Sequence, residues 1–325
     1  MDNSTLKSAL TSLKLALQPV AHFMDDPKIQ EIEINGVNNV WIERAGYQER
    51  TDIAISDAQI RTAIQVLARL GNKDARGGTR DGIIDARMEG FRVAAALPPT
   101  SVHGASICIR KHNPVLLRLE DYVSAGAFDE QTADFIRTII RDHKNILISG
   151  STSSGKTTFA NAMIAEIEQS ERVLTIEDTP ELKVKVPNWI SLESNEQANI
   201  STRDLVRLAL RYRPDRIIVG EVRGGEAYDL LDAANTGHDG VMSTIHANSS
   251  FDALSRFETL ILRGGINWPH DAICAQIART FDYVLFMARR NGQRRLCEIL
   301  SLTDFDIDTK KYKCEMVFDI KKRHK

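Results

Sequence analysis

Residues 150–158 are Gly150-Ser151-Thr152-Ser153-Ser154-Gly155-Lys156-Thr157-Thr158, which matches the pattern G-x-x-x-x-G-K-[ST]. An apolar stretch at 145–149 predicts a strand before this run, and residues 157–168 predict a helix after it. In a strand–loop–helix context, backbone N–H groups and the helix N-terminus converge on phosphate oxygens. The run therefore predicts a nine-residue ATP-binding loop, with Lys156 at the β- and γ-phosphates and the Thr157 hydroxyl at Mg²⁺.

Helices and short apolar strands alternate around this loop. Strands are predicted at 145–149, 172–177, 216–222 and 240–244, and helices at 129–143, 157–168, 201–212 and 226–235. Such alternation is typical of a largely parallel sheet that is covered by helices on both faces. Residues 129–325 are therefore predicted to form an α/β domain.

The first third of the chain has a different pattern. A helical repeat of leucines opens it, strands are predicted at 29–34 and 40–43 around the turn signal Asn35-Gly36, and Ser56 with Gln59 predicts a helix start. Further strands are expected at 92–97 and 105–111. We expect a small α+β domain over residues 1–112, followed by a linker at 113–128.

Two acidic residues follow predicted strands of the larger domain. Glu177 ends the stretch 172–177, and Glu221 follows the apolar stretch 216–219. Ligands bind at the carboxyl ends of parallel strands, so both acids should lie near the γ-phosphate. One should polarise the attacking water and the other should hold Mg²⁺ through its waters. We assign Glu177 to the water and Glu221, with Thr157, to the metal.

Histidines and arginines complete the candidate site. His238 and His246 bracket a glycine-containing segment after a predicted strand, and His246, at the strand end, is the expected γ-phosphate sensor. Cations stabilise a transferred phosphoryl group and can come from another domain or subunit. The candidates are Arg92 and Arg110 in the first domain and Arg207, Arg211, Arg213 and Arg223 in the second.

Composition excludes several classes of protein. The net charge is −2, from 42 basic and 44 acidic residues, which argues against direct nucleic-acid binding. The four cysteines form no Cys-x-x-Cys pair, which argues against a zinc site and for reduced thiols in the cytosol. No signal peptide and no apolar run of about 20 residues is found, which favours a soluble or peripheral protein.

Taken in order, the motifs resemble those of the type II/IV secretion-system traffic ATPases. The landmarks are the loop at 150–158, an acidic box at 175–182, the segment 210–224, a histidine box at 236–248, and the first-domain segments 92–99 and 106–111. The resemblance covers residues 25 to 302. It is strongest to the conjugative-transfer and type IV secretion branch, because the tetracysteine element usual in type II secretion ATPases is missing.

The resemblance implies a fold and a function. The fold would be a C-terminal RecA-like P-loop NTPase domain with a smaller N-terminal α+β, PAS-like domain. The protein would be a homohexameric motor that couples Mg-ATP hydrolysis to substrate translocation or pilus assembly. It would lie in the cytoplasm, in peripheral contact with the cytoplasmic face of the inner membrane, and its partners would be inner-membrane components of a secretion or conjugation machine. Arg92 and Arg110 would reach the nucleotide.

One departure from the family pattern bears on turnover. Ser153 stands where the family commonly has glycine, and a positive φ there would strain serine and slow turnover. This residue favours a nucleotide-gated scaffold with negligible turnover. A RecA-like nucleic-acid translocase and a pilus retraction motor of the same family are two further candidate functions.

Overall fold

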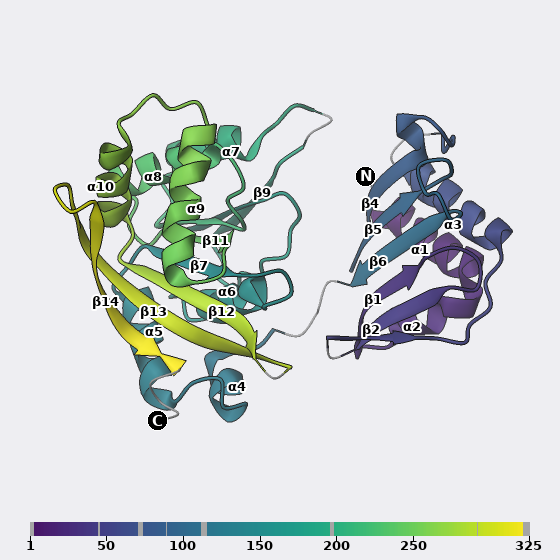
Figure 1. The fold of residues 1–325 in the computed structure, drawn as a ribbon, viewed down its shortest axis with the longest axis horizontal. Coiled ribbons are helices and arrows are strands. Elements are labelled where there is room, and N and C mark those ends of the chain that lie inside the picture. Colours follow the sequence, from purple (N-terminus) through teal and green to yellow (C-terminus); the bar gives the residue numbers. More distant parts are fainter. Residues whose placement is uncertain are drawn as a thin grey trace. The chain divides into compact units, whose positions relative to one another are not determined.

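The computed structural model describes residues 3–44, 46–70, 74–88, 90–111, 116–195, 198–290 and 292–320. By its internal contacts the chain divides into two compact units, Met1–Val115 and Leu116–Lys325 (Figure 1). Within the described ranges, no helix combines the length and the apolar character that a membrane crossing requires.

The first unit contains an antiparallel sheet of six strands in the order β3-β2-β1-β6-β5-β4. Its strands are β1 (Ile29–Ile34), β2 (Val40–Arg44), β3 (Tyr47–Arg50), β4 (Ile83–Met88), β5 (Phe91–Ala96) and β6 (Ser106–Lys111). Its helices are α1 (Asn3–Ala16), η1 (Gln18–Val20), α2 (Ala21–Asp25), α3 (Asp57–Leu70) and η2 (Arg80–Gly82).

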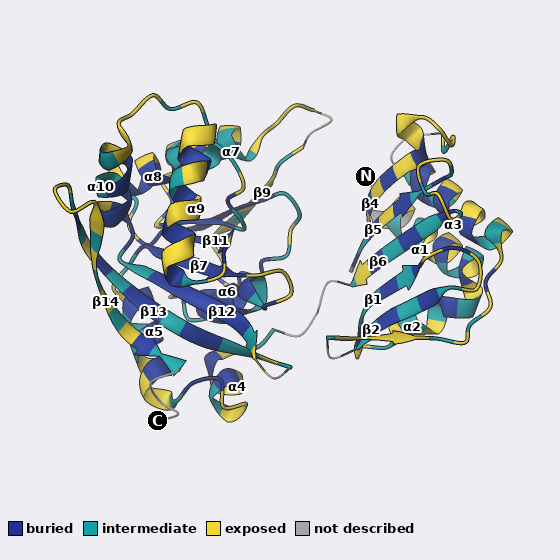
Figure 2. Ribbon diagram, viewed as in Figure 1, coloured by how far each residue is buried: buried dark blue, intermediate teal, exposed yellow. Residues whose placement is uncertain are grey.

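One face of this sheet carries the core of the first unit. Ile32, Ile64 and Val93 from β1, α3 and β5 belong to one buried apolar cluster, to which α1 also contributes. Buried and exposed residues alternate along β4, as expected for a strand with one face against a core and one toward solvent (Figure 2). The predicted helix start is confirmed, since Ser56 and Gln59 make reciprocal capping hydrogen bonds.

The second unit contains a mixed sheet of eight strands in the order β14-β13-β12-β7-β11-β10-β8-β9. Its strands are β7 (Ile146–Gly150), β8 (Val173–Glu177), β9 (Trp189–Glu193), β10 (Arg216–Val219), β11 (Met242–His246), β12 (Tyr283–Arg290), β13 (Gln293–Asp306) and β14 (Lys311–Asp319). The strands from β12 to β9 in this order run parallel, and β13 and β14 are antiparallel additions at one edge.

Helices cover both faces of this sheet. They are α4 (Leu119–Ser124), α5 (Glu130–Arg141), α6 (Lys156–Ile164), α7 (Thr202–Ala209), η3 (Leu210–Tyr212), α8 (Glu226–Asn235), α9 (Ser250–Arg263) and α10 (His270–Thr280). α4, α5 and α6 pack with one face in one apolar cluster, and α7 to α10 pack with the other face in a second cluster. The neighbours Ile146 and Leu147 on β7 belong to different clusters, so the central strand is buried on both sides.

The predicted parallel α/β domain is confirmed, but the predicted linker at 113–128 differs from the structure. Helix α4 lies within that range, and Leu119, Tyr122 and Phe128 are buried in the core of the second unit. The rings of Tyr122 and Phe159 meet edge to face, with centroids 5.3 Å apart. Because burying aromatic surface is strongly favourable, residues from Leu116 onward belong to the second unit.

Candidate nucleotide-binding site

The predicted ATP-binding loop lies at the centre of the larger sheet. β7 runs between β11 and β12, and Gly150 at its end pairs with His246 on β11 and Met287 on β12. The loop therefore emerges at the carboxyl edge of the parallel strands, which is where ligands of such sheets bind. α6 begins directly after it at Lys156, with Thr157 and Thr158 half-buried in its first turn.

Both loop glycines are required by their surroundings. A Cβ on Gly150 would lie 2.4 Å from the Met287 carbonyl oxygen and 2.5 Å from Ser154 Oγ. Gly155 has φ +90°, and a Cβ there would lie 2.8 Å from Arg294 Cδ. Neither position has room for a side chain, so the backbone of the loop requires glycine at both.

The expectation of strain at Ser153 is confirmed. Ser153 has φ +59°, in the left-handed region that favours glycine. The next residue, Ser154, is fully buried, and its hydroxyl has no hydrogen-bond partner among the described residues. The loop therefore holds a strained residue beside an unsatisfied polar group, a combination that functional loops often show.

Lys156 points back into the loop. Its Nζ donates to the carbonyl oxygens of Gly150 at 2.9 Å and Ser151 at 3.1 Å, and it lies 3.3 Å from His246 Nδ1. The side chain is buried, so its charge is poorly screened by water. This places the positive charge at the base of the loop, where the phosphates of a nucleotide would lie.

His246 joins the loop lysine to one of the two predicted acids. Its Nε2 lies 3.1 Å from Glu221 Oε1. Because an ammonium group can only donate, Nδ1 accepts from Lys156, and the ring proton lies on Nε2 and is donated to Glu221. Burial and the charge of Lys156 lower the pKa of His246, which favours this neutral ring.

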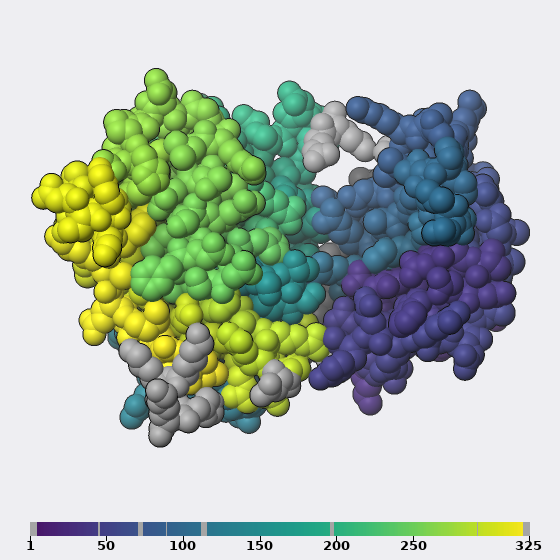
Figure 3. Space-filling view, in the orientation of Figure 1, coloured from purple at the N-terminus to yellow at the C-terminus, as the bar shows by residue number. Residues whose placement is uncertain are grey.

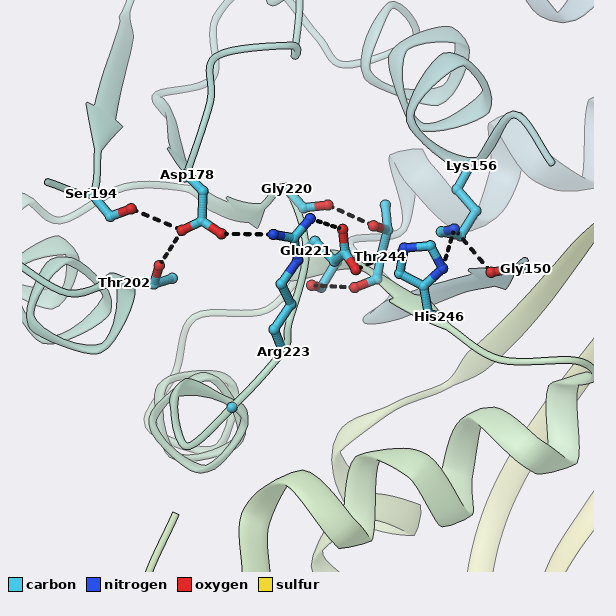
Figure 4. A network of polar contacts seen from close by, with 12 residues as sticks. Gly150, Lys156, Asp178, Ser194, Thr202, Gly220, Glu221, Arg223, Thr244 and His246 are labelled. Atoms are coloured by element: carbon cyan, nitrogen blue, oxygen red, sulfur yellow. Dashed lines mark hydrogen bonds and ion pairs between the residues drawn. The ribbon is translucent and has the colours of Figure 1, made fainter. Parts of the chain in front are cut away.

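The polar chain continues from Glu221 to the neighbouring strand (Figure 4). Arg223 Nη2 donates to Glu221 Oε2 at 2.8 Å, and Nη1 donates to Asp178 Oδ2 at 3.4 Å. Asp178 Oδ1 accepts from the hydroxyls of Ser194 at 2.8 Å and Thr202 at 3.0 Å. The contacts link the ends of β7, β11, β10 and β8, so a change at the loop has a physical route toward α7.

Glu177, the other predicted acid, is in a different environment. It is buried, and its Oε1 accepts from the backbone N–H groups of Glu181 at 2.8 Å and Leu182 at 3.0 Å. Its Oε2 is buried without a partner among the described residues. Burial raises the pKa of Glu177 to about 7. The two backbone hydrogen bonds lower this pKa, but their effect is smaller than that of burial.

The two acids also differ in their distance from the loop. A cavity of about 370 Å³ is lined by Thr152 of the loop and by Glu221, Val222, Arg223, His246 and Arg256. Glu177 is not among its lining residues. β8 is the third strand from β7, which places its end about 14 Å away at a strand spacing of about 4.8 Å. Glu221 is thus the acid that the fold brings to the loop.

The arginines predicted in the first unit lie on its sheet. Arg92 on β5 is paired in register with Arg110 on β6, so the two side chains leave the same face side by side. Arg92 also makes a salt bridge with Asp85 at 2.9 Å. This pair lies on the face opposite the buried cluster of the first unit.

Two of the four arginines predicted in the second unit make contacts of different kinds. Arg223 belongs to the polar chain described above. Arg207 instead donates to Asp229 at 2.7 Å, a carboxylate that it shares with Arg203, and so it joins α7 to α8. His238 lies in the turn after α8, and its Nδ1 is buried without a partner in the described part of the chain.

Three residues at the site were not predicted. Asp178 follows Glu177 directly, and its role depends on Arg223, which is 45 positions away. Arg256 lies on α9 and Arg294 on β13, and each comes near the loop only through the packing of its element. No local pattern marks the two arginines, because arginines on a helix or strand surface are common, whereas Asp178 lies in the acidic box at 175–182 but was given no role.

Comparison with known proteins shows the family to which this chain belongs. The model of the family "Type II/IV secretion system protein" matches residues 14–298, which span both units. The chain belongs to this family. The conjugal transfer protein TrbB of Rhizobium radiobacter is a relative that is 34% identical over 287 residues, covering 87% of this chain and 86% of that protein. VirB11, a type IV secretion system protein of Brucella suis biovar 1, is 31% identical over 323 residues, covering 87% of each chain.

Two solved ATPase structures are similar to this chain in fold. The VirB11 ATPase of the Brucella suis type IV secretion system aligns with a TM-score of 0.50 at 27% identity, covering 92% of this chain and 96% of that one. The Legionella pneumophila ATPase DotB aligns with a TM-score of 0.65 at 21% identity, covering 91% of this chain and 82% of DotB. The latter likeness concerns the fold alone.

Proposed function

We propose that this protein is an ATPase motor of a type IV secretion or conjugation machine, which couples Mg-ATP hydrolysis to substrate translocation or pilus assembly. The observation that carries the proposal is the polar chain Lys156–His246–Glu221–Arg223 at the mouth of the loop. It brings a lysine, a histidine, a glutamate and an arginine together at the carboxyl edge of a parallel sheet. Family membership and the TrbB and VirB11 relatives support the same function.

The loop residues would bind the phosphates. Lys156 would exchange its contacts with the Gly150 and Ser151 carbonyl oxygens for the β- and γ-phosphate oxygens. The fit is supported by the buried Ser154 hydroxyl, which has no partner among the described residues, and by the positive φ of Gly155 at the start of α6. Thr157 and Glu221 would hold Mg²⁺, which when bound neutralises charge that develops on the phosphates.

The acids would divide two tasks. Glu221, beside the loop, would serve the metal. Glu177, whose pKa is raised to about 7, has the basicity suited to orienting and deprotonating water near neutral pH. From the end of β8 it would act when the segment that holds its Oε1, at Glu181 and Leu182, moves with the nucleotide.

His246 would sense the γ-phosphate. A nucleotide that draws Lys156 away from Nδ1 removes one of its two polar contacts, and the other contact, at Nε2, leads to Glu221 and Arg223. The change would reach Asp178 and the start of α7 through Thr202. Such a relay would connect hydrolysis to movement within the second unit.

The wider arrangement is part of the proposal. We place the second unit in the RecA-like class and the first in the PAS-like class, with Arg92 and Arg110 supplying cations to the nucleotide. The assembly would be a homohexamer at the cytoplasmic face of the inner membrane, bound to membrane components of the machine. Support comes from the alignment of both units with VirB11 and from the shared face of the two arginines. Electron microscopy of the purified protein with and without an ATP analogue tests ring formation.

Phosphate release by the purified protein tests the roles of the acids. Glu177→Gln should bind ATP and turn over poorly, and Glu221→Gln should lose the dependence of nucleotide binding on Mg²⁺. If Glu177→Gln stays fast while Glu221→Gln is inactive, Glu221 activates the water and the assignment is reversed.

A second candidate is a nucleotide-gated scaffold with negligible turnover. It is favoured by Ser153, whose φ of +59° strains the loop. The same assay separates the two candidates. A wild-type protein that binds Mg-ATP but releases phosphate no faster than Lys156→Ala would be a scaffold.

A further inference from the structure

Three side chains of different chemistry meet between α9 and α10. They are Glu258 of α9 and His270 and Cys274 of α10, and one ligating atom from each lies within 4.8 Å of the others. His270 Nε2 is 3.0 Å from Glu258 Oε2, and Cys274 Sγ is 3.7 Å from His270 Nε2. Positions i and i+4 of a helix share a face, so α10 presents the imidazole and the thiol together.

Two of the three distances between these atoms are close to those found around a tetrahedral metal ion, and the third, between sulfur and oxygen, is within 4.8 Å. Zinc binds sulfur at about 2.3 Å and nitrogen or oxygen at about 2.0–2.2 Å, so its ligands are separated by about 3.3–3.8 Å in a tetrahedron. The sulfur–nitrogen distance lies in this range, and the nitrogen–oxygen distance is about 0.3 Å below it. The His270 side chain is 56% exposed, so it can rotate and lengthen the nitrogen–oxygen distance by this amount.

Neighbouring residues hold two of the three side chains in place through a hydrogen bond and apolar packing. The Tyr312 hydroxyl on β14 donates to Glu258 Oε1 at 2.6 Å, which leaves Oε2 facing the histidine. Cys274 packs with Ala278 and Phe305 in a small apolar cluster. In the space-filling view the yellow C-terminal segment lies beside a green surface of the second unit (Figure 3). The Tyr312–Glu258 hydrogen bond joins the cluster to this segment. Hydrogen-bonded ligands in an apolar setting are typical of metal centres.

A reactive thiol is a poorer explanation for the cluster. Reactive cysteines are exposed and have a depressed pKa. Cys274 is 1% exposed, so an external substrate has little access to its sulfur. Its sulfur is therefore not prepared for attack on an external substrate, whereas a metal ion could displace the proton.

We propose that Glu258, His270 and Cys274 form a binding site for a zinc ion, with a fourth position open to solvent. A thiolate, an imidazole and a carboxylate are ligands that zinc accepts together, while Mg²⁺ and Ca²⁺ require oxygen ligands. The site is separate from the loop and its acids. It would fasten α9 to α10 and, through Tyr312, to the C-terminal strands. The missing Cys-x-x-Cys motif excludes only a contiguous zinc motif, since these ligands come from two helices.

Metal binding by the purified full-length protein tests this site. The protein is stripped with a chelator, kept free of nucleotide, and titrated with Zn²⁺ in excess Mg²⁺, and the bound zinc is measured by elemental analysis after desalting. Co²⁺ serves as an optical probe, because a cobalt–thiolate bond gives a charge-transfer band in the near ultraviolet. We expect one tightly bound zinc per chain and a cobalt–thiolate band.

The variants distinguish this site from others in the protein. Cys274→Ser and His270→Ala should abolish the band and lose tight zinc binding, and Tyr312→Phe should weaken binding by about 10- to 100-fold. Cys108→Ser, whose thiol donates to Glu31 in the first unit, and Thr157→Ala in the loop should bind zinc as the wild type does.

Two results would overturn the proposal. One is a wild-type protein that gives no cobalt–thiolate band, in which case the cluster is a hydrogen-bond network only. The other is a Cys274→Ser variant that binds zinc normally. Circular dichroism of each variant checks the fold, and the cobalt band remains decisive because it reports the sulfur directly. ATP turnover is measured separately, so loss of turnover with zinc binding intact would count against the ATPase proposal and not against this one.

Discussion

Replacing Glu177 by glutamine should change how stability depends on pH. The carboxyl group is 4% exposed, and burial raises its pKa from 4.5 to about 7. Its charged neighbours act in opposite directions, since Glu181 raises this pKa and Lys183 lowers it. Glutamine has the same shape, and its Oε1 can still accept from the backbone N–H groups of Glu181 and Leu182. The substitution therefore removes the charge and keeps the local hydrogen bonds.

The size and sign of the effect follow from the two pKa values. The folded state holds the proton more tightly, so the stabilising contribution of protonated Glu177 is complete below pH 4.5 and is lost as pH rises through 7. A pKa that rises from 4.5 in the unfolded chain to about 7 in the folded protein corresponds to about 3 kcal/mol. The free energy of unfolding of Glu177→Gln, minus that of the wild type, should thus rise by about 3 kcal/mol between pH 4.5 and pH 8.

Urea unfolding at several pH values, without nucleotide, measures this difference. Trp41→Phe in both proteins confines the tryptophan signal to the second unit, where Trp189 donates to Thr175 on the strand that ends at Glu177. Glu168→Gln, which removes an exposed carboxylate of the same unit, is the control and should show no such trend. A difference that stays constant from pH 4.5 to pH 8 would refute the assignment of a buried, easily protonated carboxyl group.

Three further substitutions give separate tests. Ser153→Gly relieves about 1 kcal/mol of strain from the left-handed backbone conformation and adds a backbone entropy cost of similar size. The free energy of unfolding should therefore change little, and kcat for phosphate release should rise. An unchanged or lower kcat would show that the strain does not limit turnover. Gly150→Ala places a methyl group 2.4 Å from the Met287 carbonyl oxygen, which should destabilise the fold by about 1–3 kcal/mol in thermal melts. The same change should weaken the binding of a fluorescent ATP analogue. Normal binding would show that the loop tolerates a side chain at position 150. Arg216→Met leaves the buried carboxylate of Glu171 with only the more distant His143 Nε2, at 3.7 Å, and should cost about 3–5 kcal/mol in urea unfolding, most of it recovered by adding Glu171→Leu. A single variant as stable as wild type would show that the buried pair is dispensable.

The sequence predicted the part of the fold that local patterns encode. The strand before Gly150 and the helix after it follow from an apolar run, a glycine-rich loop and a helical repeat, and all three are local. The C-terminal strands β12 to β14 were not predicted. Register shifts interrupt β12 with β13 and β13 with β14, so buried and exposed residues do not alternate regularly along β13.

The sequence likewise predicted only the part of the site that follows from the order of strands and motifs. Lys156, Glu221 and His246 come together because the carboxyl ends of adjacent strands converge, a consequence of topology that motif order can anticipate. Arg223 was one of several candidate arginines, and only the structure separates it from Arg207, which pairs with Asp229 between helices. The way two helices pack against each other cannot be read from either helix alone. For this reason the sequence did not predict that Glu258 of α9 would lie beside His270 and Cys274 of α10.

The central claim is that Lys156 anchors an ATP-hydrolysing site. Steady-state phosphate release from Mg-ATP by the purified wild-type protein, by Lys156→Ala and by Lys144→Ala tests it most directly. Lys144 lies in the same unit and makes a salt bridge with Asp282, so its variant controls for the loss of a lysine. We expect Lys144→Ala to hydrolyse ATP like the wild type and Lys156→Ala to fall to background. Near-normal turnover by Lys156→Ala would contradict the account.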